Sequence, residues 1–326
     1  MTDDPDPYGD LPYVERLPVL GVPTVFASDD AAVTAAIRAA YGHWRPYAVS
    51  DPAAPDDRAD PVVRIAVRPG SRAHAGGTGP ALRVTAPGRL VLRAAGVAGW
   101  ADAARGVSIA VVAPSVVAQG DRFLDEVLEP LTLFLLGHRD RQPIHAAAIV
   151  RGDTAILLAG PSGAGKSTLT YAASRHGFSV LADEPVYVQL RPRLRVWGRR
   201  ARLHLPPEAR QLFPELMGIE PMRLPTGKTK LVIDAGEGPR SAERACLCVL
   251  RRDPDRVARL EPLATEAAVL ALTASLDPGY DLFAATIGER VRRVAEGGAW
   301  SLAVSPDPRD ALPLLHEVAA AMEPVP

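Results

Sequence analysis

The residues best suited to do chemistry lie at positions 154–168, where the sequence reads TAILLAGPSGAGKST. The five apolar residues 155–159 predict a buried strand, and the segment 160–167 matches the phosphate-loop pattern G-x-x-x-x-G-K-[ST] before a predicted helix. Glycines let the backbone turn its N–H groups toward phosphate oxygens, and the helix adds its positive N-terminal end. The segment therefore predicts a nucleoside triphosphate site with a magnesium ion.

Each residue type of this loop has an expected role. Lys166 is expected to reach the β- and γ-phosphates, and the Ser167 hydroxyl to coordinate Mg²⁺. The predicted nucleotide-binding residues are Gly160, Ser162, Gly163, Ala164, Gly165, Lys166, Ser167 and Thr168.

An acidic pair, Asp183 and Glu184, ends the apolar segment 178–182, one strand–helix–strand step after the loop. That step places the pair at the carboxyl edge of the sheet, where open α/β sheets bind ligands. Phosphoryl transfer needs an acidic group for the attacking hydroxyl, so Asp183 is predicted to be the catalytic base. Glu184 either helps to hold Mg²⁺ or points away, because adjacent strand residues face opposite sides.

Three further features each allow two interpretations. His145 lies on the strand before the loop. It either supports the site, near the γ-phosphate or Asp183, or packs as a structural histidine. We include it with Asp183 and Lys166 among the catalytic candidates. The arginines between 191 and 202 are a phosphate or acidic-peptide clamp or, as we favour, a solvated run. The segment 226–230, TGKTK, is a substrate-contacting loop or an ordinary turn.

Composition limits the class of protein. The 326 residues are 47% hydrophobic and 23% charged, which is typical of a globular protein of two domains or one large one. A net charge of −1 gives no field that attracts nucleic acid or membrane, and no apolar run approaches a membrane span. The acidic, proline-rich first residues do not resemble a signal peptide, so we expect a cytoplasmic protein. Cys246 and Cys248 are expected to be buried strand residues in a reducing compartment.

Hydrophobic patterning predicts an α/β fold in two parts, a small N-terminal domain over 1–118 that is a candidate for substrate docking and a catalytic domain over 119–326. In the first part, residues 1–20 are expected to form a loose arm or an edge segment, and Asp29 or Asp30 to cap a helix that ends at Tyr41. Its strands are expected at 24–26, 62–67, 82–85, 90–93 and 107–112.

A helix over 121–136 is expected to join the two parts. In the second part, the segments 144–150 and 154–159 predict an antiparallel hairpin around a short Gly-Asp turn. The helix after the loop is expected to be capped by Gly177. Further strands are expected at 186–190, 194–197, 230–234, 247–250 and 300–304, and helices at 207–213, 266–276, 281–295 and 308–322.

Residues 143–190 resemble the catalytic core of HPr kinase/phosphorylase, and are especially similar to HPr-kinase-like proteins such as the kinases that phosphorylate lasso-peptide precursors. The resemblance implies a P-loop kinase core related to phosphoenolpyruvate carboxykinase. It implies Lys166 and Ser167 for phosphates and magnesium, Asp183 for activation of the hydroxyl, and His145 near the γ-phosphate. The implied function is an ATP-dependent serine kinase acting on a peptide or small protein, with ATP and Mg²⁺, and with a homo-oligomer as a possible assembly.

The chain departs from the family pattern at three places. Pro161 stands where the family usually has Asp, Glu184 where it has a second Asp, and the later glycine- and arginine-bearing segment of the bifunctional enzymes is missing. The missing segment argues against HPr as the acceptor and against reverse phosphorolysis. Two other functions stay open: a small-molecule kinase, which also places an acidic strand end after the loop helix, and a non-catalytic ATP-binding sensor, of which Pro161 and Glu184 would be signs.

Overall fold

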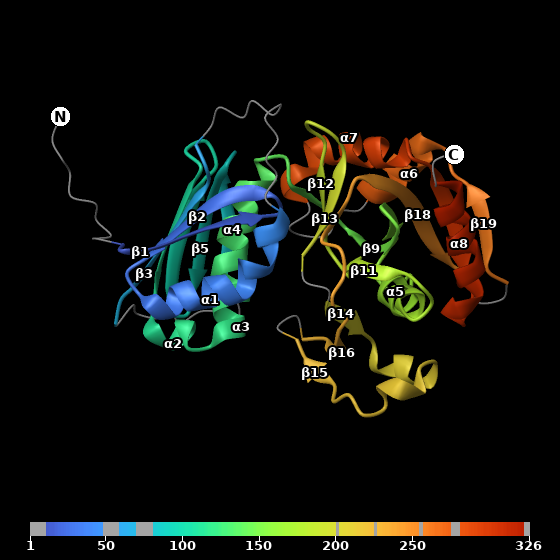
Figure 1. Ribbon diagram of the computed structural model, residues 1–326, viewed down its shortest axis with the longest axis horizontal. Coiled ribbons are helices and arrows are strands. Elements are labelled where there is room, and N and C mark those ends of the chain that lie inside the picture. Colours follow the sequence, from blue (N-terminus) through green and yellow to red (C-terminus); the bar gives the residue numbers. More distant parts are fainter. Residues whose placement is uncertain are drawn as a thin grey trace. The chain divides into compact units, whose positions relative to one another are not determined.

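The computed structural model describes residues 11–47, 59–69, 81–199, 202–224, 227–253, 257–274 and 281–322 (Figure 1). Contacts divide the chain into two units, Met1–Arg141 and Gln142–Pro326, and both are of mixed α/β type. The sequence-based boundary at 118/119 differs from this division. Residues 119–141 belong to the first unit, because α4 (Glu129–Gly137) packs on strands β6 and β7 of that unit.

The first unit is built on a mixed seven-stranded sheet in the order β1-β2-β3-β7-β6-β5-β4. Its strands are β1 (Tyr13–Val19), β2 (Val22–Ser28), β3 (Val62–Val67), β4 (Ala81–Ala86), β5 (Arg89–Ala94), β6 (Val97–Asp102) and β7 (Val107–Val112). The predicted strands are confirmed, and β1 shows that the described part of 1–20 includes an edge strand. The sequence missed β6, which contains Gly99 and few large apolar residues.

Helices accompany this sheet. They are α1 (Ala31–Tyr41), η1 (Gly42–Tyr47), α2 (Pro114–Val117), α3 (Gly120–Phe123), the π-helical turn η2 (Leu124–Leu128) and α4. Asp30 caps α1, since its Oδ1 accepts a 2.7 Å hydrogen bond from the backbone N–H of Ala32. The single helix predicted over 121–136 is three segments, because the π-helical turn interrupts it.

A buried charge ties β1 to the helical side of this unit. Glu15 is 9% exposed and accepts hydrogen bonds from Arg38, at 2.6 Å, and from Arg45. Burial raises the pKa of the Glu15 carboxyl, but the two guanidinium groups outweigh this, so the net pKa lies below its ordinary value.

The second unit is centred on a six-stranded sheet in the order β11-β9-β10-β18-β20-β19. The strands are β9 (Ala146–Arg151), β10 (Thr154–Ala159), β11 (Ser179–Ala182), β18 (Arg244–Arg252), β19 (Arg259–Pro262) and β20 (Ala299–Val304). The predicted hairpin is confirmed: β9 and β10 are antiparallel, with Thr154 opposite Arg151 and Gly152 at φ +58° in the turn. Both β10 and β11 run antiparallel to β9, so they point the same way with β9 between them.

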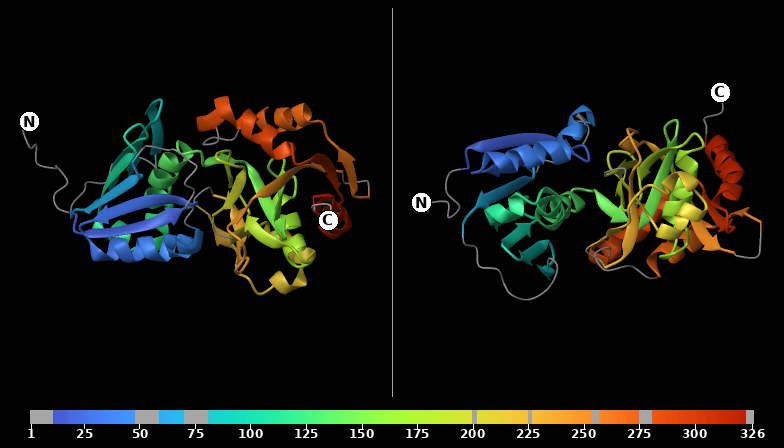
Figure 2. Two further views of the ribbon diagram at one scale, coloured as in Figure 1. Left: turned by 45° about the horizontal axis from the view of Figure 1, so that its top comes forward. Right: turned by 90° about the horizontal axis from the view of Figure 1, so that it is seen from below.

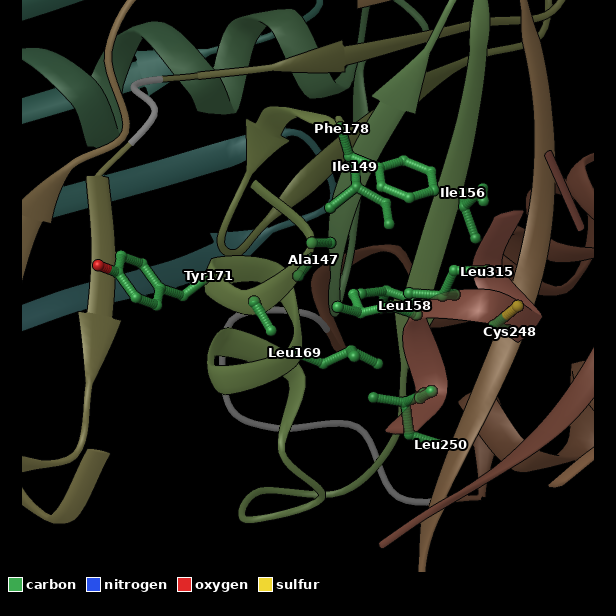
Figure 3. Close-up of a cluster of buried hydrophobic side chains, with 14 of the residues drawn as sticks. Ala147, Ile149, Ile156, Leu158, Leu169, Tyr171, Phe178, Cys248, Leu250 and Leu315 are labelled. Atoms are coloured by element: carbon green, nitrogen blue, oxygen red, sulfur yellow. The ribbon is translucent and has the colours of Figure 1, made fainter. Parts of the chain in front are cut away.

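Both faces of this sheet are buried, which explains the uninterrupted apolar run of β10. Ile156 and Leu158 face one core, which also contains residues of α5 (Lys166–Ser174) and α8 (Leu312–Ala321) (Figure 3). The alternate residues of β10 face a second core, which includes residues of α6 (Thr265–Thr273) and α7 (Ala284–Ala295). Figures 1 and 2 show α6 and α7 side by side.

Cys246 and Cys248 are both fully buried in the first core, as predicted. Burial raises the pKa of the Cys246 thiol to about 12 and that of Cys248 well above its ordinary value. Among the described residues, no helix is long and apolar enough to cross a membrane.

Two small sheets complete the second unit. One has the order β17-β13-β12-β8 and the other β14-β16-β15. Their strands are β8 (Gln142–Ile144), β12 (Val186–Gln189), β13 (Arg195–Gly198), β14 (Arg202–Leu205), β15 (Met222–Arg223), β16 (Thr229–Asp234) and β17 (Ser241–Ala242). The remaining short helices are η3 (Pro207–Gln211), η4 (Pro214–Leu216), η5 (Asp281–Phe283) and η6 (Pro308–Ala311).

The predicted β12–β13 hairpin is confirmed, but β8, β14, β15, β17 and β19 were not predicted as strands of their own, because two to four residues carry little periodicity. Gly198 at the end of β13 lies so close to β11 that a Cβ on it would be 1.8 Å from the Leu181 carbonyl oxygen. This approach fixes the strand that leads into Asp183.

Candidate functional site

The segment 160–165 connects β10 to α5 as a tight loop. Gly163 and Gly165 have φ values of +85° and +98°, and Gly165 is the N-cap of α5. Gly160 is needed for packing, because a Cβ there would lie 3.0 Å from the Leu250 carbonyl oxygen on β18. The loop therefore ends at the N-terminus of a nine-residue helix, where backbone N–H groups and the helix dipole favour an anion.

A pocket of about 710 Å³ lies against this loop, within the size range of small-molecule sites. The predicted site residues that line it are Ser162, Gly163, Gly165, Lys166, Ser167, Thr168, His145, Asp183 and Glu184. Gly160 and Ala164 lie outside its lining: Ala164 packs its side chain into the core and donates its backbone N–H to the Pro161 carbonyl oxygen at 3.0 Å.

Lys166 is 7% exposed and is held at the base of the loop. Its Nζ donates to the Gly160 carbonyl oxygen at 2.7 Å, and lies 2.9 Å from His145 Nε2 and 3.6 Å from Glu184 Oε2. His145 Nε2 is also 2.8 Å from Glu184 Oε1. Because an ammonium only donates and a carboxylate only accepts, His145 bonds Lys166 when Nε2 is unprotonated and Glu184 when Nε2 carries hydrogen.

Asp183 is 5% exposed and follows directly on β11. Its Oδ2 accepts a 2.7 Å hydrogen bond from the backbone N–H of His204 and lies 3.6 Å from His204 Nδ1. Its Oδ1 is buried and, among the described residues, has no hydrogen-bond partner. An unsatisfied buried oxygen costs free energy, so this atom suits a ligand that donates a hydrogen bond to it.

Two histidines lie at this site, and each is beside a different part of it. His145 contacts Lys166 and Glu184, whereas the histidine beside Asp183 is His204 on β14. The alternation Leu203-His204-Leu205 was the available signal, since it places a polar residue on one face of an apolar strand.

The two basic segments that allowed two interpretations, 226–230 and 191–202, differ in their relation to the pocket. Lys228 and Lys230 of the segment 226–230 line the pocket, while Thr226 lies outside the described residues. The described arginines of the 191–202 run lie outside the pocket lining, and Arg200 is not described. Arg195 pairs with Glu243, its guanidinium carbon lies 5.2 Å from the centre of the Trp197 ring, and its side chain is 14% exposed, so this arginine belongs neither to a clamp in the pocket nor to a solvated run. The pocket is completed by residues that the sequence did not indicate, namely His204, Pro206, Glu208 and Arg252.

The donor set fits a nucleotide-bound magnesium ion. The Ser167 hydroxyl and the Glu184 carboxylate line the same pocket, and oxygen ligands of this kind suit Mg²⁺. Among the described residues, no group of three or more His, Cys, Asp or Glu side chains is arranged to hold a metal. The remaining ligands of such an ion would be phosphate oxygens and water.

No family model matches this chain, and no curated protein matches it. Among solved structures it is similar to the Hpr(Ser) kinase/phosphatase from Coxiella burnetii, with 12% sequence identity and a TM-score of 0.30 over 55% of this chain and 99% of that one. These values are too low to assign a fold or a function, so the interpretation of the site depends on its own geometry.

Proposed function

We propose that the second unit is a P-loop kinase core of the HPr kinase type, and that it transfers the γ-phosphate of ATP to a hydroxyl of a peptide or small protein. The observation that carries this proposal is a buried Asp183 whose Oδ1 has no described partner, in the same pocket as Lys166 and the loop. A phosphate cradle and an acidic group that can accept a hydroxyl proton are the two parts that phosphoryl transfer requires.

In this proposal each of the pocket residues named below has one role in phosphate transfer. Lys166 Nζ and the N–H groups of the loop bind phosphate oxygens, and Ser167 with Glu184 holds Mg²⁺, which neutralises phosphate charge when bound. Asp183 Oδ1 accepts the proton of the acceptor hydroxyl, while the His204 N–H holds Oδ2 in place. His145 positions Lys166 and Glu184 relative to each other.

The remaining parts of the proposal rest on the sequence. The acceptor is a serine, for which a ribosomal natural-product precursor such as a lasso peptide is one candidate. The first unit docks the substrate, the protein acts in the cytoplasm, and it has neither nucleic acid nor membrane as a partner. Association into a homo-oligomer belongs to the same proposal.

The test is transfer of γ-labelled phosphate from ATP, with Mg²⁺, into a lysate of the native host, followed by separation by mass. Label in a protein or peptide band supports the proposal, and the Lys166→Ala variant should abolish it. Arg293→Ala is the matched control, because it removes an exposed cation on α7 outside the pocket. Label confined to metabolites would instead indicate a small-molecule kinase. Tight ATP binding without transfer to any host component would indicate a sensor.

A further inference from the structure

The three-stranded sheet β14-β16-β15 has two different faces beside the pocket. Leu203, Leu205 and Leu231 are fully buried in the core that also contains α5 residues. His204 is opposite Val232 in the antiparallel register, and Lys230 lies two residues before Val232, so their side chains share the other face. This face borders the pocket, because His204, Lys228 and Lys230 all line it.

The face carries positive charge that the described residues do not neutralise. Lys228 is exposed and Lys230 is half-buried, and Arg252 reaches the same pocket from the end of β18. Among the described residues, none of these three cations has an ion-pair partner within 4.0 Å, in contrast to Lys166. Three acidic residues line the same pocket. Asp183 and Glu184 have the contacts given above, so Glu208 is the remaining one.

The cationic face is fixed next to the proposed base. The hydrogen bond from the His204 N–H to Asp183 Oδ2 joins β14 to the segment that carries Asp183. The turn before β16 is held by hydrogen bonds from the Leu224 N–H to the Lys228 carbonyl and from the Gly227 N–H to the Leu224 carbonyl. Because Asp183, Lys228 and Lys230 line one pocket, the residues that flank a hydroxyl at Asp183 Oδ1 enter the same pocket as the two lysines.

We propose that Lys228, Lys230 and Arg252 form a recognition site for acidic side chains that flank the acceptor hydroxyl. This inference deepens the proposed function and rests on it for the identity of the chemistry, but not for the binding itself. Lys166, the loop N–H groups and the N-terminus of α5, which follow β10 of the six-stranded sheet, are available to the phosphates. Lys230 instead lies on β16 of a separate sheet, and Lys228 in the turn before that strand. Charge complementarity of this kind selects partners and orients them.

The experiment measures binding of two fluorescent heptapeptides, each with a central serine, flanked by glutamates in one and by lysines in the other. Fluorescence anisotropy is recorded with the full chain, Mg²⁺ and a non-hydrolysable ATP analogue. We expect the glutamate peptide to bind about tenfold more tightly at low salt, and the difference to shrink as salt screens it. Lys228→Glu with Lys230→Glu should reverse the preference.

Arg223→Glu is the control for a charge reversal on this sheet, because Arg223 pairs with Thr229 and so lies on the opposite face. It should leave the peptide preference unchanged. If the reversed variants fold poorly by thermal unfolding, Lys228→Gln with Lys230→Gln provides the same test and should reduce the preference to the part that Arg252 supplies.

Equal binding of both peptides to the wild-type protein would overturn the inference. So would a tenfold loss of MgATP-analogue affinity in the lysine variants, which would assign the lysines to the nucleotide. A charge preference in binding without phosphate transfer to either peptide or to the host lysate would support the recognition site and contradict the kinase proposal. The two failures are therefore distinguishable.

Discussion

Replacement of Asp183 by asparagine isolates the proposed base from the rest of the site. Asparagine has nearly the same volume, and its carbonyl oxygen can accept the hydrogen bond that Asp183 Oδ2 accepts from His204. The other position, now the unpaired Oδ1, would hold an amide nitrogen that cannot accept a proton. Loss of a general base costs about 10²- to 10⁴-fold in rate, which corresponds to about 3–5 kcal/mol of transition-state stabilisation.

The assay compares kcat for phosphate transfer from γ-labelled ATP with the affinity for a MgATP analogue in the same preparations. We expect kcat to fall by about 10²-fold or more, while nucleotide affinity changes by less than about threefold, because Lys166 and the loop are untouched. Asp234→Asn is the matched control: Asp234 also accepts a backbone hydrogen bond, from Gly236 at 2.9 Å, but lies outside the pocket.

Undiminished turnover in the Asp183→Asn protein would refute the assignment of Asp183 as the base. Loss of nucleotide binding together with turnover would refute it in another way, since Asp183 would then support the architecture of the site. Equal losses in the Asp234→Asn control would show that the assay reports stability, and thermal unfolding midpoints of both variants identify that case.

Three further predictions concern stability and reactivity. Gly198→Ala should lower the free energy of unfolding of the second unit by on the order of 3 kcal/mol in chemical denaturation, and should also lower turnover, because the added Cβ would collide with Leu181. An unchanged unfolding midpoint would show that β11 and β13 can move apart without loss of stability. A maleimide at pH 8 should label neither Cys246 nor Cys248 in the native protein and both after unfolding, which mass spectrometry reads directly. Because the pKa of Glu15 is lowered on folding, its stabilisation is present above the ordinary value of 4.5 and is lost as pH falls through the lower folded value. Glu15→Gln should therefore reduce the unfolding midpoint at pH 7 more than at pH 3, and a pH-independent effect would contradict the ion-pair explanation.

Local sequence predicted most of the elements that position the site. The apolar run 155–159, the glycines of the loop and the start of α5 are contiguous, so their pattern fixes strand, loop and helix without long-range information. The Gly-Asp turn likewise predicted the β9–β10 hairpin, and two cysteines two residues apart were correctly expected to be buried. Errors occurred where periodicity was short, as in β14 and β15, or where a π-helical turn interrupted a long apolar pattern.

The sequence by itself therefore determined the segment in which β10, a glycine-rich loop and α5 follow one another, the position of Asp183 at a strand end and the α/β class. Only the tertiary structure decided which side chains surround Asp183. His204 holds the carboxylate through its backbone N–H, a group that every residue except proline carries and that no sequence pattern reveals. Lys228, Lys230 and Arg252 line one pocket because the start of β16 and the end of β18 border it, and the charge of a residue does not encode where its strand lies in space.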